Sequence, residues 1–113
     1  MPEPRIASAI LVNALIRRAE AEGGFGAVLA RGDATAGAIA MVLVERGANP
    51  KFLERVLQPD GRYAWQETRL SMESDGELKA LIERRRRFDP DLWILELDIV
   101  SVERFAAEMN SIG

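Results

Sequence analysis

The chain has 113 residues and a mass of 12.5 kDa, the size of one domain. Hydrophobic residues make up 48% and charged residues 29%, a balance typical of folded proteins and too apolar for disorder. Histidine and cysteine are both absent, which excludes disulfides, thiolate nucleophiles, imidazole bases and the zinc sites built on those ligands. The net charge of −3 argues against a dedicated nucleic-acid-binding protein.

The first elements in the chain are a predicted helix and two predicted strands. Apolar residues recur at helical spacing over residues 6–22, and Gly23 with Gly24 ends that helix. Residues 25–31 and 37–45 have the composition of strands. The second strand is apolar without alternation, which predicts a central strand covered on both faces.

Turn residues separate the elements that follow. The Gly-Ala-Asn-Pro segment 47–50 predicts a turn after the central strand. Residues 52–57 and 62–68 then predict a hairpin around the Pro-Asp-Gly segment 59–61. Polar residues interrupt both strands of this hairpin, so we expect it near the edge of the sheet.

The second long helix follows the hairpin. Ser74 and Glu77 have the spacing of a capping box, in which each side chain bonds the backbone N–H of the other residue. The buried face of this helix is expected to carry Leu78, Leu81 and Ile82. Proline at position 90 stops the helix, because the residue before a proline disfavours helical geometry.

A last strand and a short helix complete the predicted fold. Residues 92–99 are apolar on one face, whereas Glu96 and Asp98 lie on the other. Ser101 is placed to cap a tail helix. The order of elements predicts a single α+β domain over residues 1–113: a largely antiparallel sheet of about five strands, two main helices and a short C-terminal helix.

A run of four consecutive arginines, residues 84–87, is the most conspicuous candidate for chemistry. At helical spacing the four side chains point in different directions, and only Arg85 projects with the apolar residues. Cations in the last turn of a helix complement its dipole, which explains the run structurally. Phosphate contact would instead require a shared surface with other arginines. The candidate anion-binding residues are Arg17, Arg18, Arg31, Arg84, Arg86 and Arg87.

A second candidate is a cluster of polar loop residues. Its members lie in the predicted turn at 31–36 and in the Asp-Pro-Asp turn at 89–91. They are Arg31, Asp33, Thr35, Asp89 and Asp91. Such carboxylates suit magnesium or calcium, but their spacing matches no EF-hand loop, and Asp before Pro is an ordinary turn. We therefore expect no metal and no cofactor.

Two blocks of sequence resemble a known family. The first comprises Arg17-Arg18-Ala19, Gly23-Gly24-Phe25, Ala27-Val28-Leu29 and residues 31–38, and the second is Phe88-Asp89-Pro90-Asp91-Leu92-Trp93 with the Ile-Leu-Glu that follows. Together they are similar to the alphaproteobacterial domain-of-unknown-function family numbered 1491. The chain departs from that pattern between Glu45 and Gln66 and after Asp98. The family has no assigned activity, so the resemblance implies lineage and an intact domain but no function.

The function expected from the residues is protein–protein contact. No serine lies in a nucleophile elbow and no carboxylate pair has acid–base spacing, so no catalytic residue is predicted. We expect a small, non-catalytic binding or regulatory module in the cytoplasm, with an unidentified protein or a second copy as its partner. The expected contact surfaces are Ile10, which lies off the buried arc of the first helix, and the tail helix.

One alternative belongs to a different class. A phosphate-directed protein would bind RNA or a nucleotide, or hydrolyse it, through the arginine cluster. Nucleic acid is the less favoured partner because the chain is acidic. A membrane partner is not expected, since no apolar stretch is long enough to span a bilayer.

Overall fold

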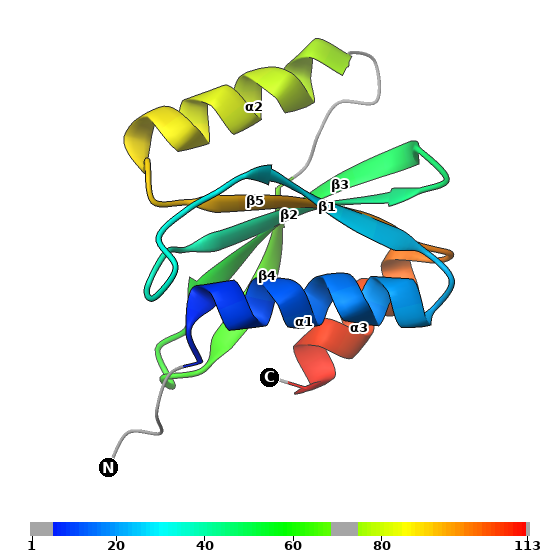
Figure 1. The fold of residues 1–113 in the computed structure, drawn as a ribbon, viewed down its shortest axis with the longest axis horizontal. Helices are drawn as coiled ribbons and strands as arrows, with labels where there is room; N and C mark the ends of the chain where they lie inside the picture. Colours follow the sequence, from blue (N-terminus) through cyan, green and yellow to red (C-terminus); the bar gives the residue numbers. More distant parts are fainter. Residues whose placement is uncertain (1–5, 69–74, 113) are drawn as a thin grey trace.

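The computed structural model describes residues 6–68 and 75–112, which contain three helices and five strands. In chain order these are α1 (Ser8–Ala21), β1 (Phe25–Ala30), β2 (Ile39–Glu45), β3 (Ala48–Leu57), β4 (Tyr63–Thr68), α2 (Asp75–Phe88), β5 (Trp93–Asp98) and α3 (Val102–Ile112). The strands form one sheet in the order β1-β5-β2-β3-β4 (Figure 1). Only the β2–β5 pair is parallel. The predicted α+β class and mostly antiparallel sheet are confirmed.

Helices cover both faces of this sheet. In Figure 1, α1 and α3 lie on one side and α2 lies on the other, so the fold has three layers. The larger apolar cluster lies under α1 and α3, and it includes Leu15, Phe105 and Met109. The smaller cluster lies under α2, where Leu81 is buried and Leu78 packs against it. We call these two sides the α1/α3 face and the α2 face.

The central position of β2 explains its continuous apolar sequence. Its two neighbours are β5 and β3, so neither of its edges is open. Met41 and Leu43 belong to the cluster on the α1/α3 face, whereas Val42 and Val44 belong to the cluster on the α2 face. Apolar residues are therefore required on both sides of the strand, as the lack of apolar–polar alternation in its sequence predicted.

The turn after β2 is shorter than predicted. Arg46 and Gly47 have φ values of 50° and 79°, so the hairpin turns on these two residues with type I′ geometry. β3 begins at Ala48, and Pro50 lies inside it, so the prediction of a turn over residues 47–50 is wrong. Proline is tolerated because it lies where the register between β2 and β3 shifts, between the Leu43–Lys51 and Glu45–Ala48 pairs.

The tail helix docks on its own domain. The Ser101 hydroxyl accepts a hydrogen bond from the Arg104 backbone N–H at 3.2 Å, which confirms the predicted cap. Phe105 is 1% exposed and lies in the core, so the apolar side of α3 is used inside the domain. Ile10 is 63% exposed, as its position off the buried arc predicted. The other predicted cap residue, Ser74, lies outside the described residues.

The helices of the described residues are all too short or too polar to cross a membrane. The longest, α1 and α2, have 14 residues each, about 21 Å of helix.

Candidate functional site

The predicted loop cluster lies at the start of α1, where the β1–β2 loop crosses it. The Ser8 backbone N–H donates to the Thr35 carbonyl at 3.2 Å, and the Ala9 N–H donates to the Ala34 carbonyl at 2.9 Å. The Ser8 hydroxyl donates to the Gly37 carbonyl at 2.7 Å. These contacts satisfy N–H groups in the first turn of α1 that have no partner within the helix.

The other side of the same loop is held by the turn that precedes β5. The Asp33 backbone N–H donates to the Asp91 carbonyl at 3.0 Å. The indole N–H of Trp93 donates to the Asp33 carbonyl at 2.7 Å. A Cβ at Gly32 or Gly37 would stand closer than 3.0 Å to the Asp91 carbonyl oxygen, so only glycine allows this approach. The two sequence blocks that resemble the family meet at this junction.

The carboxylates of the cluster stabilise its turns. Asp33 Oδ2 accepts hydrogen bonds from the backbone N–H groups of Thr35, at 3.2 Å, and Ala36, at 2.8 Å. Asp89 Oδ1 accepts one from the Asp91 N–H at 3.1 Å. Among the residues the structure describes, no group of three acidic side chains is arranged to hold a metal ion. The structure thus brings the predicted cluster together. The contacts of the cluster join the β1–β2 loop to the turn that precedes β5.

The arginines lie on opposite sides of the sheet rather than on one surface. Arg17 and Arg18 belong to α1, whereas the arginines at 84, 86 and 87 are exposed on α2 (Figure 1). Arg31 follows β1, and its guanidinium lies 5.7 Å from the centre of the Trp93 ring. Arg85, predicted to project with the apolar residues, pairs with Glu54 at 2.8 Å.

Glu108 joins α3 to α1. Its carboxylate accepts hydrogen bonds from Arg18 Nη2 at 2.7 Å and from Arg104 Nε at 3.2 Å. The hydrogen bond from Arg18, with a smaller contribution from that of Arg104, holds the pKa of the Glu108 carboxyl below its ordinary value. Because the pKa is lowered in the folded state, the stabilising contribution is present at neutral pH and is lost as pH falls through that lowered pKa.

Removing one arginine tests this assignment. Arg18→Met should raise the pKa of Glu108 toward its ordinary value, because the hydrogen bond that lowers it most would be gone. Arg17→Met is the matched control, since Arg17 is an exposed neighbour on α1. The pKa of Glu108 in each variant is measured by following its carboxyl carbon chemical shift by NMR across the acid pH range. An unchanged Glu108 titration in Arg18→Met would contradict the contact.

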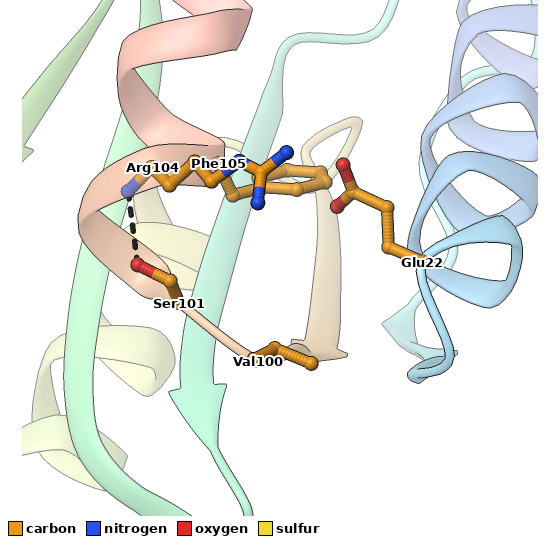
Figure 2. Close-up of a pocket in the computed structure, with 5 residues that line it drawn as sticks. All are labelled: Glu22, Val100, Ser101, Arg104 and Phe105. Atoms are coloured by element: carbon orange, nitrogen blue, oxygen red, sulfur yellow. Dashed lines mark hydrogen bonds between the residues drawn. The ribbon is translucent and has the colours of Figure 1, made fainter.

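A shallow depression lies where the end of α1 meets the start of α3. It has a volume of about 270 Å³ and is lined by Glu22, Val100, Ser101, Arg104 and Phe105. Figure 2 shows the Glu22 carboxylate and the Arg104 guanidinium facing each other across it. The Ser101 hydroxyl already caps α3, and Arg104 already bonds Glu108, so the lining offers no activated nucleophile or base.

The most distinctive exposed feature is edge strand β1. It lies at one end of the sheet and pairs with β5. Its sequence, Phe-Gly-Ala-Val-Leu-Ala, has no charge and no proline, although Phe25, Val28 and Leu29 are 64%, 41% and 46% exposed. A register shift between Val28 and Ala30 marks a bulge at Leu29. The opposite edge, β4, carries Gln66 and Glu67.

Sequence reasoning predicted the strand at 25–31 but not its edge position. The composition of β1 is the signal that was available, since charge and proline are two of the features that protect edge strands, along with bulges such as the one at Leu29. That signal has meaning only once the strand is known to be an edge.

The fold and its exposed features define a three-layer α+β protein with an uncharged sheet edge. The family model for proteins of unknown function, DUF1491, matches residues 6–107. The chain belongs to the DUF1491 family, as the two sequence blocks indicated. No curated protein matches the chain in sequence.

Solved structures from two bacteria share this fold. The crystal structure of a DUF1491 family protein from Caulobacter crescentus CB15 is 34% identical, with a TM-score of 0.80, over 89% of this chain and 94% of that one. An NMR structure of a DUF1491 family protein from the same organism is 36% identical, with a TM-score of 0.73, over 83% and 86%. The solution structure of protein Atu0922 from A. tumefaciens is 33% identical, with a TM-score of 0.74, over 90% and 92%.

Proposed function

We propose that this chain is a non-catalytic module that lies in the cytoplasm and works by protein–protein contact through edge strand β1. The supporting observation is that β1 combines three exposed apolar side chains with a complete lack of charge. An edge strand also presents a row of backbone N–H and C=O groups to which another strand can bond. Such an edge promotes association with another chain.

The polar groups support the non-catalytic part of the proposal. The Asp33 and Asp89 carboxylates bond backbone N–H groups in their own turns. Arg18 and Arg85 pair with carboxylates. The phosphate-directed alternative has less support, because its arginines are divided between helices on opposite sides of the sheet.

Photo-crosslinking in the bacterium that encodes the chain tests the proposal. A benzophenone amino acid at position 29 should give a covalent adduct to a protein, because Leu29 lies on the contact edge. The control is the same replacement of Leu57, which is 52% exposed compared with 46% for Leu29 but lies in β3. Mass spectrometry identifies the adduct as a second copy or as another protein.

Three results would contradict the proposal. They are no adduct from position 29, equal adducts from both positions, or recovery of RNA as the crosslinked partner. RNA contact would also show a steep fall of affinity with salt, which an apolar strand interface does not.

A further inference from the structure

We infer that the partner of β1 is β1 of a second copy, paired antiparallel about a two-fold axis perpendicular to the sheet. This inference rests on the proposed function and names the partner of the same surface. The two five-stranded sheets would then form one continuous sheet. Pairing with a second strand would satisfy the backbone groups along both edges.

The composition of β1 suits pairing with itself. In a two-fold antiparallel pair, residues near the axis face their own copies, so any charge there faces a like charge. Charged residues make up 29% of the chain, but β1 has none. The other edge strand, β4, carries Glu67, and self-pairing there would bring like charges together. Of the two edges, β1 is therefore the one suited to a second copy.

The charges at the two ends of β1 are complementary. Arg31 directly follows the strand, and Glu22 precedes it at the end of α1. An antiparallel pair places the end of one strand beside the start of the other. Both residues are exposed, so Glu22 can leave Arg104, which it faces within one copy, and pair with Arg31 of the second copy, once at each end of the interface.

The two charges also lie on the same side of the sheet. Arg31 lies over Trp93, a member of the cluster on the α1/α3 face, and Glu22 ends α1, which covers that face. A two-fold axis perpendicular to the sheet keeps each face on its own side. With the axis at Ala27, the end of β1 that Arg31 follows lies beside the start of the second copy's β1, which Glu22 precedes.

Apolar side chains on both faces of β1 would lie beside the second copy's strand in the joined sheet. Phe25 pairs with Asp98 of β5 and shares the α2 face, whereas Val28 pairs with Leu95 on the α1/α3 face. With the axis at Ala27, Phe25 of one copy lies beside the bulge at Leu29 of the other. Cross-strand contacts of this kind stabilise sheets and would cover side chains that are exposed in a single copy.

Sedimentation velocity of the purified full-length chain at micromolar concentration should show a dimer. Ala27→Lys places like charges across the axis and should weaken the dimer by at least about tenfold. Within one copy the new lysine would face Glu96, its cross-strand partner, so folding should be preserved. Gln66→Lys adds the same charge to the opposite edge and should leave the dimer unchanged.

Reversing the terminal charges tests the antiparallel arrangement. Arg31→Glu and Glu22→Arg should each weaken the dimer by roughly threefold, and the double variant should restore it, because the pair is re-formed with opposite signs. A monomer at every concentration, a dimer that tolerates Ala27→Lys, or no restoration in the double variant would overturn the inference. A monomer whose position 29 crosslinks to a different protein would overturn it and leave the proposed function standing.

Discussion

Gly32→Ala is expected to destabilise the fold by about 3 kcal/mol, the upper end of the cost of an overpacked site. A Cβ at position 32 would lie 2.8 Å from the Leu92 carbonyl carbon and closer still to the Asp91 carbonyl oxygen. Both obstacles are backbone atoms of the turn before β5, so no side-chain rotation relieves the overlap. The substitution should also break the hydrogen bond from the Asp33 N–H to Asp91.

Thermal and denaturant unfolding measure this effect. A loss of about 3 kcal/mol corresponds to a fall in Tm of roughly 12–24 °C for a chain of this size. Gly61→Ala is the control, because Gly61 has a φ of 86° with nothing within 4 Å of an added Cβ. That variant should lose only about 1 kcal/mol, the cost of the left-handed conformation. If the two variants were equally stable, the close approach at Gly32 would be refuted.

Phe105→Ala should destabilise the fold by about 3–5 kcal/mol, because it removes a fully buried aromatic ring. Phe105 is 1% exposed and belongs to the cluster that joins α3 to the sheet and to α1. The effect is informative because the match to the family model ends at residue 107, inside α3. A large loss would show that α3 is part of the folding unit.

The control for this prediction lies on the same helix. Glu103 is exposed, so Glu103→Ala should change stability by less than about 0.5 kcal/mol. Both variants are compared by denaturant midpoint and slope, which separate a change in stability from a change in compactness. A loss below about 1 kcal/mol for Phe105→Ala would mean that α3 does not contribute to the core.

Local patterns predicted nearly every element. The helical periodicity of residues 6–22 predicted α1, and the unbroken apolar run predicted the buried strand β2. Hydrophobic periodicity carries this information because it records which side of each element must be buried. The cap at Ser101 was equally predictable from the sequence, since capping involves residues only a few positions apart.

The turn between β2 and β3 shows where local reasoning failed. The Asn-Pro pair suggested a turn at 47–50, but the chain reverses at Arg46 and Gly47. Arginine is rarely left-handed, so nothing in the sequence marks it as a turn residue. The pairing of the flanking strands determines the reversal.

What the residues alone established is a list of elements, their buried sides, the absence of imidazole and thiol chemistry, and the family. Tertiary structure added the order of strands: β5 inserts between β1 and β2, which leaves β1 at an edge. It also divided the arginines between two sides of the sheet and joined residues 31–38 to residues 88–93. These facts depend on contacts between residues far apart in the chain, which periodicity and spacing do not encode.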